Sequence, residues 1–468
     1  MISKSLMKKS GIYLIGNLSS KIMSALLIPI YAFSVSVNDL GYFDFSQTIM
    51  GILSPIIILA IWEAILKFVL IEDNLEKKRK IITTSAIFSI FVAILFLLFT
   101  IIIKQFLVYT LDYFYLIILM IVLHSLVYVW QYYARANGED RLYISAGILA
   151  TIINFLLIIV LVVFFNLGLL GLLIAYNVSQ FSIILIIENK LRVISNLELI
   201  DFDFKLLKKM ILFSSPLVLN LISAWFISGF GRLIVTLELG SESNGLYSFA
   251  IKFSLVITML GTVITMAIIE EAIMAVKSKK FDESFNKTLE SLFQIFQSIT
   301  LIAVPLILIF YHFISDTDYY NSLELAPWLL LYAVANTMAS NMGSVFQAID
   351  KTKYQFITTL LGAFVTIVIS YSLIHVIGVI GVITGQVLGA ITMLLSRYIL
   401  INKFVKLKIF WLPIILRLLS FVIITFICIN SNLMVNVFIE LLLLIFFYYM
   451  NRKIVSKFLF KLKGKLVR

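Results

Sequence analysis

Long apolar runs separated by short polar loops dominate the pattern of hydrophobic and polar positions along this chain. A helix of about 20 apolar residues crosses the hydrocarbon core of a bilayer. Fourteen runs reach that length, near residues 11–33, 45–70, 81–103, 113–134, 142–165, 167–188, 211–237, 245–276, 289–314, 323–347, 355–376, 378–402, 411–429 and 432–450. The pattern therefore predicts an all-α polytopic membrane protein with about 14 transmembrane helices.

Short motifs recur at a slowly drifting offset, which indicates an internal repeat. The matched pairs are Lys8-Lys9 with Lys208-Lys209, Gly41 to Phe45 with Gly245 to Phe249, Glu63 to Ile65 with Glu271 to Ile273, and Gly168 to Gly171 with Gly378 to Gly381. Each copy holds six spans, so both enter the membrane in the same orientation. The expected domains are a six-helix lobe at 1–189, a cytoplasmic linker at 190–209, a second six-helix lobe at 210–402, and two extra helices with a basic tail at 403–468.

Composition agrees with a membrane location, and the charges define an orientation. The chain is 62% hydrophobic and 13% charged, whereas a soluble domain has about 25% charged residues. The net charge of +12 invites a nucleic-acid partner, but thirty of the 37 Lys and Arg lie in loops and termini on one side of the spans. The opposite loops hold Lys104 and acids such as Asp39 and Asp44. Because cytoplasmic loops carry the excess of Lys and Arg, both termini are expected in the cytoplasm and no nucleic acid is expected as a partner.

Polar side chains form stripes at helical spacing in three of the spans. The stripes comprise Asn17, Ser20, Lys21 and Ser24 in the first span, His124, Tyr128, Gln131 and Arg135 in the fourth, and Asn336 and Ser340 in the tenth. Asn336 and Ser340 match His124 and Tyr128 in the repeat. Such stripes fit the lining of a polar cavity between the lobes. The alternative is hydrogen bonding between helices inside each bundle.

Cations inside the spans point to the candidate binding site. A Lys or Arg at the bilayer centre costs about 2.5 to 3.5 kcal/mol, so it calls for a partner or an aqueous cavity. Lys21, Arg232 and Lys252 are the candidate cavity cations, and Gly229 and Gly231 leave room beside Arg232. The alternative for Lys21 and Arg232 is an ion pair with an acid on a neighbouring helix, and for Lys252 it is a side chain that extends outward.

The remaining charged residues have other expected roles. Lys67 follows Glu63 by one helical turn and is expected to pair with it. Arg397 and Arg417 are within reach of the cytoplasmic surface and are expected to extend towards it. Glu63 and Glu271, which match in the repeat, are candidate acids for ion coupling. A lone Cys428 and three scattered histidines offer no ligand cluster, so neither a metal nor a cofactor is expected.

An excess of cations favours an anionic substrate, because a cation and a phosphate charge at 6 Å and an effective dielectric of 20 attract by about 3 kcal/mol. The residues from Ser20-Lys21 to Leu27-Ile28-Pro29-Ile30-Tyr31, then Asp39 to Phe43 and Gln47-Thr48-Ile49, together with Asn244 to Tyr247, resemble the polysaccharide transport family of oligosaccharide flippases. That family belongs to the multidrug/oligosaccharidyl-lipid/polysaccharide flippase superfamily.

The resemblance implies a flippase in the bacterial cytoplasmic membrane. Its substrate would be undecaprenyl-diphosphate-linked oligosaccharide repeat units, moved from the inner to the outer leaflet for O-antigen or capsule synthesis by alternating access. Lys21 and Arg232 match in position the cations expected in the first and seventh helices. The implied partners are the lipid-linked glycan, membrane lipids and the polysaccharide polymerase machinery.

Three alternatives remain. A lipid II-type flippase shares the helix layout. A cation-coupled multidrug exporter shares the repeat but requires an acid in the first helix, where this chain has Lys21. A membrane glycan polymerase or glycosyltransferase would need a catalytic site, and Asp201-Phe202-Asp203 lies in a short linker with no domain around it. We therefore expect a transporter and not an enzyme.

Overall fold

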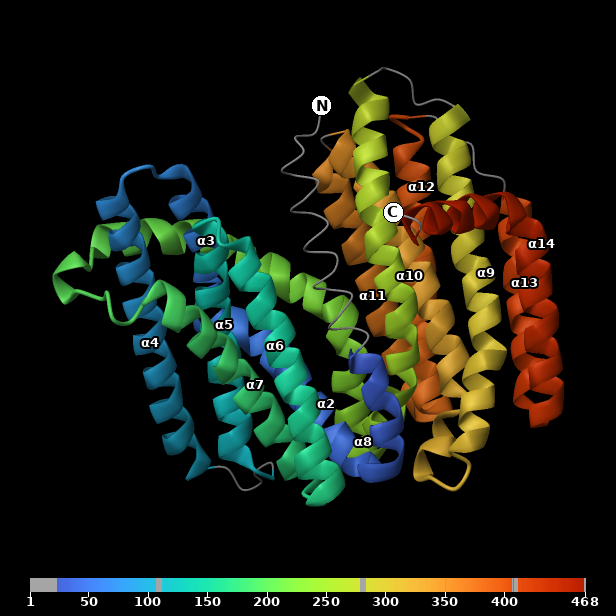
Figure 1. The fold of residues 1–468 in the computed structure, drawn as a ribbon, viewed down its shortest axis with the longest axis horizontal. Coiled ribbons are helices and arrows are strands. Elements are labelled where there is room, and N and C mark those ends of the chain that lie inside the picture. The colour runs from blue at the N-terminus through green and yellow to red at the C-terminus, as the bar shows by residue number, and fades with distance from the viewer. Residues whose placement is uncertain are drawn as a thin grey trace. The chain divides into compact units, whose positions relative to one another are not determined.

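The computed structural model describes residues 23–106, 112–277, 283–349, 351–405, 407 and 411–466, and all regular structure in these ranges is helical (Figure 1). An unnumbered helix, Met23–Ser34, comes first. It is followed by α2 (Val37–Ile57), α3 (Ile61–Ile71), α4 (Leu75–Lys104), α5 (Phe114–Ala136), α6 (Asp140–Ile158), the π-helix η1 (Ile159–Phe164), α7 (Gly168–Leu191), the short 3₁₀ helix η2 (Leu199–Asp201), α8 (Phe204–Lys277), α9 (Glu283–Phe313), the 3₁₀ helix η3 (Asp318–Ser322), α10 (Leu325–Ala348), α11 (Thr352–Ile377), α12 (Val379–Ile401), α13 (Trp411–Ile429) and α14 (Leu433–Leu466).

The helices have the length and apolar composition of membrane spans. Nine described helices qualify singly, a tenth span comes from the bent pair α2 and α3, and Met23–Ser34 and Leu433–Tyr449 are shorter apolar helices. Much of their apolar surface faces outward, as at Phe99 of α4 and Phe364 of α11, both more than half exposed. A helix that exposes large apolar side chains is stable where lipid and not water surrounds it. The expected all-α polytopic membrane fold is confirmed.

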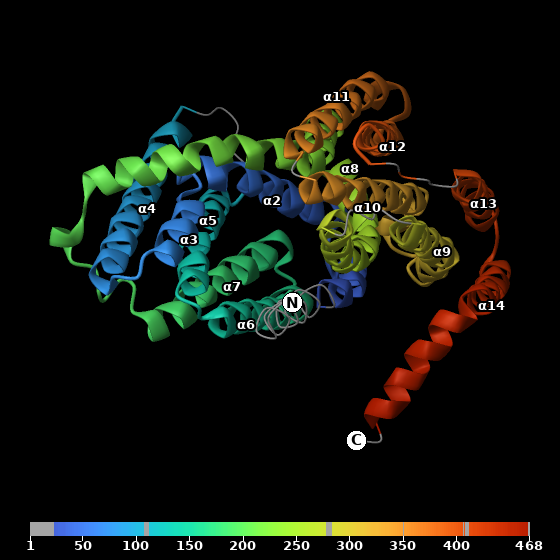
Figure 2. The same cartoon turned by 90° about the horizontal axis from the view of Figure 1, so that it is seen from above.

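Contacts divide the chain into two compact units, 1–248 and 249–468, with the boundary inside α8. In the first unit α7 packs against α5 and α6, and α3 packs against α5. In the second, α12 packs against α10 and α11, while α13 and α14 both contact α9 (Figure 2). The boundary falls later than the one expected between lobes, because residues between 225 and 248 of α8 contact α2. The predicted domain limits stay a prediction.

The second predicted span, 45–70, is not one continuous helix. It breaks at residues 58–60, and α2 and α3 meet there at 53°. Leu59 and Ala60 adopt the left-handed conformation, with φ of 51° and 47°. The amide of Ala60 donates to the carbonyl oxygen of Pro55 at 2.9 Å, which closes a wider turn than an α-helix has. Pro55 inside α2 marks the disturbance in sequence, but the apolar periodicity runs straight through it.

Glycine breaks the helix at the predicted junction between the seventh and eighth spans. Gly240 has φ of 86° and ψ of 173°, and the helical stretches on both sides of it form α8. Gly168 and Gly378, a matched pair in the repeat, also have positive φ, at 49° and 60°. Only glycine adopts such angles without steric cost. Both glycines stand at the start of a helix, Gly168 as the first residue of α7 and Gly378 as the residue before α12.

Two charged side chains differ from expectation. Arg397 does not extend towards the surface, because its side chain is buried among α10, α11 and α12. Its Nε donates to Thr358 Oγ1 at 3.1 Å, its Nη2 to Thr359 Oγ1 at 2.8 Å, and its Nη1 to the carbonyl of Ala339 at 2.6 Å. Lys67 does not pair with Glu63, because its Nζ lies 4.0 Å from the ring centre of Phe213. Both expectations considered only positions along one helix. In the structure, contacts with neighbouring helices determine where each side chain lies.

Candidate functional site

An ion pair joins α2 to α8 within the first unit. Nε of Arg232 lies 2.8 Å from Oδ2 of Asp44, and the Asp44 side chain is 8% exposed while that of Arg232 is 24% exposed. The Nε–H of Arg232 and Oδ2 of Asp44 do not meet the geometry of a hydrogen bond. Their contact is therefore an ion pair without a directed hydrogen bond. Asp44 is therefore not an outer-loop acid as predicted, because it lies inside α2 and faces α8.

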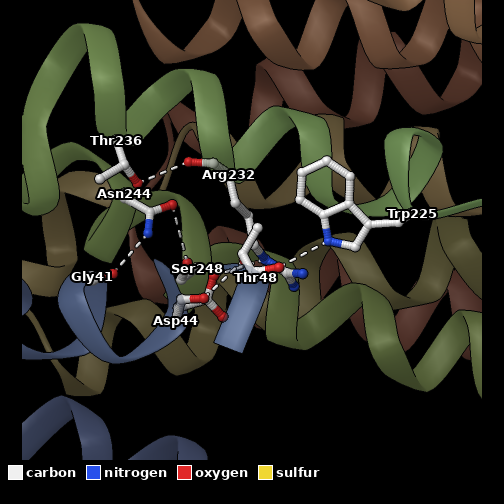
Figure 3. A network of polar contacts seen from close by, with 8 residues as sticks. All are labelled: Gly41, Asp44, Thr48, Trp225, Arg232, Thr236, Asn244 and Ser248. Atoms are coloured by element: carbon white, nitrogen blue, oxygen red, sulfur yellow. Dashed lines mark hydrogen bonds and ion pairs between the residues drawn. The ribbon is translucent and has the colours of Figure 1, made fainter. Parts of the chain in front are cut away.

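Further polar contacts surround this pair (Figure 3). Thr48 Oγ1 donates to the carbonyl of Asp44 at 2.8 Å, and Nε1 of Trp225 donates to the carbonyl of Thr48 at 2.9 Å. The Trp225 indole also fills the space beside Gly229, where an added Cβ would lie 2.6 Å from the ring. The room predicted at Gly229 is thus taken by a side chain of the same helix.

On α2, a close crossing with α8 lies one turn before Asp44 of the ion pair. A Cβ on Gly41 would lie 1.8 Å from the carbonyl oxygen of Ser241, and one on Gly245 would lie 1.9 Å from the carbonyl oxygen of Val37. Asn244 Nδ2 donates to the carbonyl of Gly41 at 2.8 Å. Gly41 and Gly245 are partners in the repeat, and so are Val37 and Ser241, with the same separation in sequence. The two copies therefore meet at this crossing through equivalent residues.

The predicted polar stripe of the fourth span lies on α5, where His124 and Tyr128 pack against α7 and α3. Tyr128 stacks on Trp62 with ring centres 4.4 Å apart, and His124 lies 3.4 Å from Gln180 Oε1 through its Nδ1. Tyr176 Oη lies 3.3 Å from the same His124 nitrogen. These contacts are of the helix-to-helix kind. A cavity-lining role for the stripe stays a prediction.

Glu63 lies at the end of this aromatic face. Its Oε1 accepts hydrogen bonds from Trp62 Nε1 at 3.1 Å and from Tyr132 Oη at 3.3 Å. The guanidinium of Arg135 lies 5.0 Å from the ring centre of Tyr132. Glu63 is thus held by neutral donors, with a cation one residue further along the face. A role in ion coupling stays a prediction.

The other predicted site residues are distributed as follows. Asn17, Ser20 and Lys21 lie outside the described residues, as does the side chain of Glu271. Ser24 is exposed and Gln131 half-buried in the first unit, while Lys252 and Asn336 are half-buried and Ser340 exposed in the second. Among the described site residues, those of the α5 stripe share one helix face, and Arg232 contacts Asp44 of α2.

Sequence reasoning missed Asp44, Thr48 and Trp225 as members of the Arg232 site. A signal existed for Asp44. It falls within the repeated segment that begins at Gly41, where its partner in the second copy is the hydroxyl residue Ser248. Thr48 follows it by one helical turn. Trp225 carried no signal, because an aromatic residue in an apolar span usually packs against neighbours or lipid.

The fold is that of a polytopic membrane protein, and the comparisons identify its family. Residues 6–269 match the family described as polysaccharide biosynthesis protein. The chain belongs to this family, and the match confirms the resemblance to polysaccharide flippases. No curated protein sequence matches the chain.

Solved structures share the fold at low sequence identity. A lipid II flippase MurJ in an inward closed conformation is 14% identical, with a TM-score of 0.69, covering 96% of this chain and 100% of that one. An inward-facing multidrug resistance MATE family transporter of the MOP superfamily is 16% identical, with a TM-score of 0.63, covering 83% of this chain and 98% of that one. A MATE protein in a straight conformation is 16% identical, with a TM-score of 0.53, covering 85% of this chain and 95% of that one. These matches show that the chain shares the fold of these three proteins.

Proposed function

We propose that this protein moves undecaprenyl-diphosphate-linked oligosaccharide repeat units from the inner to the outer leaflet of the bacterial cytoplasmic membrane, for O-antigen or capsule synthesis. Family membership supports a role in polysaccharide synthesis. Abundant apolar helices and a flippase-like fold support translocation across a bilayer. Both termini are proposed to be cytoplasmic, and the polymerase machinery is proposed as the partner that consumes the product.

The observation that carries the proposal is the Arg232 side chain beside Asp44, which is 24% exposed as a whole. Guanidinium binds phosphate oxygens through paired hydrogen bonds as well as it binds carboxylate. Within the described residues, Oδ2 of Asp44 accepts no hydrogen bond and lies against Arg232 as an ion pair. In this proposal Arg232 exchanges Asp44 for a phosphate of the substrate, and returns to Asp44 after release.

Lys21 and Lys252 are proposed as further cations for the diphosphate, and the polar side chains of the stripes as partners for the sugars. Glu63 and Glu271 are proposed as the acids that couple transport to an ion gradient. If protons drive transport, collapse of the pH gradient stops translocation in the wild-type protein. An unchanged rate after collapse would exclude proton coupling.

The decisive experiment uses a strain that lacks its own repeat-unit flippase. Wild-type protein restores surface glycan, whereas Arg232→Ala and Lys21→Ala reduce it at least about tenfold, the loss expected for one charge-assisted contact. The matched control is Lys190→Ala, because Lys190 forms an exposed ion pair with Glu139. Undiminished surface glycan in the double variant Lys21→Ala/Arg232→Ala, at equal protein level, would refute the assignment of these cations.

A lipid II-type flippase is the second candidate, favoured by the match to MurJ over 96% of this chain. Expression in a strain depleted of its lipid II flippase separates the two. Rescue of growth would favour lipid II. Restored surface glycan without rescue of growth would favour the oligosaccharide repeat unit.

A further inference from the structure

A pocket of about 390 Å³ lies among α9, α13 and α14, all in the second unit. Its polar lining comes from Gln294 and Ser298 of α9 and from Arg417 and Ser420 of α13. Its apolar lining includes Leu416 and Phe446, which are both more than half exposed on the outer face of the helices. The pocket therefore opens on the surface that lipid covers.

Arg417 is the charged residue in this lining. It forms no ion pair with an acid in the part of the chain that the structure describes, and its Nη1 donates weakly to the carbonyl of Pro413 at 3.4 Å. A guanidinium near the end of a membrane span attracts an anionic partner, because anionic headgroups lie at that depth. Neutral hydroxyl and amide groups around it can complete the coordination of an anion but cannot neutralise the cation.

The depth of the guanidinium matches that of lipid phosphates. Arg417 is in the second turn of α13, about 9 Å along the axis from Trp411, and its contact with Pro413 points back towards the start of the helix. That start follows the basic stretch that contains Lys403. Basic residues gather at the membrane surface, where the headgroup phosphates lie.

The pocket changes from polar to apolar along the helices. Gln294 and Ser298 lie in the first turns of the membrane window Phe293–Phe313, while Leu301 and Ile302 follow them deeper in α9. On α13, Arg417 and Ser420 precede Ile424 in the same direction. A polar end at headgroup depth that continues into an apolar groove matches the shape and chemistry of a phospholipid.

We infer that the pocket among α9, α13 and α14 binds an anionic phospholipid of the bilayer, with the phosphate on Arg417 and Ser420 and an acyl chain along Ile302, Ile424 and Leu443. The bound lipid neutralises Arg417 and fills the space between the two unrepeated helices and α9. The site holds a resident lipid, and its lining shares no described residue with the contacts of Arg232 and Asp44.

The test measures lipid binding to the purified full chain by native mass spectrometry, with phosphatidic acid and with diacylglycerol of the same acyl chains. These two lipids differ only in the phosphate. Wild-type protein should retain phosphatidic acid in preference to diacylglycerol. Arg417→Gln should weaken phosphatidic acid binding about tenfold, as expected for loss of a charge-assisted hydrogen bond, and Arg417→Lys should weaken it less.

Two further variants keep the test decisive if Arg417→Gln is poorly folded. Ile424→Trp fills the apolar part of the pocket and should lower binding without touching the cation, whereas Lys104→Gln removes a cation outside the second unit and should leave binding unchanged. Equal retention of phosphatidic acid and diacylglycerol, or wild-type binding by both pocket variants, would overturn the proposal. So would displacement by inorganic phosphate alone, or binding confined to a polyprenyl phosphate, because the site would then belong to a free anion or to the cargo. The readout is lipid retention and not transport. A negative result here would therefore leave the proposed function unaffected, and a failed transport test would leave the lipid site unaffected.

Discussion

At the scale of single residues, the charged side chains inside the spans have found different partners. Arg232 has a carboxylate, Arg397 has two hydroxyls and a carbonyl, and Lys67 has an aromatic ring. Each arrangement lowers the cost of a cation in the membrane interior in a different way. The neutral hydrogen-bond partners of Arg397 surround a buried side chain, whereas the Arg232 side chain beside Asp44 is 24% exposed.

The Asp44 and Arg232 side chains should be energetically coupled. Asp44→Asn or Arg232→Gln alone should each destabilise the protein by about 1–3 kcal/mol, because each leaves a poorly solvated partner. The double variant should lose less than the sum, with a coupling energy of about 1–2 kcal/mol. Thermal unfolding of the purified protein in detergent measures all three. The control pair, Glu139 and Lys190, is exposed and should show at most about 1 kcal/mol. Additive losses for Asp44 and Arg232 would contradict a functional ion pair.

At the buried position of Arg397, an uncharged apolar side chain should destabilise the protein less than a cation that cannot form the same hydrogen bonds. Arg397→Lys keeps a desolvated cation but cannot reach Thr358, Thr359 and the carbonyl of Ala339 together, so it should cost roughly 2–3 kcal/mol. Arg397→Met removes the charge and should cost about 1 kcal/mol. The difference appears as a lower unfolding midpoint for the lysine variant. An equal or higher midpoint for that variant would show that charge, and not hydrogen bonding, holds α10, α11 and α12 together.

At the scale of helices, the crossing of α2 and α8 depends on two glycines that match in the repeat. The backbones approach so closely that neither Gly41 nor Gly245 can carry a Cβ in this arrangement. Close contact through small residues is a common way for membrane helices to associate.

Alanine at either glycine should open the crossing. A disulfide between Asn38→Cys and Ser241→Cys reports on it, since the native side chains are hydrogen-bonded to each other. Gly41→Ala or Gly245→Ala should reduce the yield of this disulfide by roughly tenfold, because the Cβ would overlap a carbonyl group. Gly147→Ala is the control, since nothing lies within 4 Å of its added Cβ. An unchanged yield in the Gly41 and Gly245 variants would show that the helices have room to adjust.

At the scale of the whole molecule, charge determines how the chain sits in the bilayer. In a Cys428→Ser background, Lys104→Cys should react with a membrane-impermeant thiol reagent on intact spheroplasts, and Lys78→Cys should react only after lysis. The physical reason is the excess of Lys and Arg in the loops on the side of Lys78. Labelling in the reverse order would invert the proposed topology and with it the direction of transport.

The amino-acid sequence alone predicted the class of fold and the family, and its recurring motifs indicate a repeat. Apolar runs of spanning length, their even number in each copy and the distribution of cations are properties of the linear chain, and lipid enforces them on any structure it forms. The sequence also marked Arg232 and the face of α5, because a charge or a polar stripe in an apolar span stands out wherever it lies.

Only the tertiary structure decided which groups meet. The sequence predicted Asp44 as a loop acid, whereas in the structure it lies in α2 and contacts Arg232 of α8. It predicted Arg397 as a surface cation, whereas the side chain is buried between α10, α11 and α12. The break at Leu59 and Ala60 was not predicted, because the sequence is continuously apolar there. Apolar side chains are equally stable in lipid on any outward face of a helix. The apolar pattern therefore does not reveal which other helix packs against it. That choice depends on packing between distant parts of the chain.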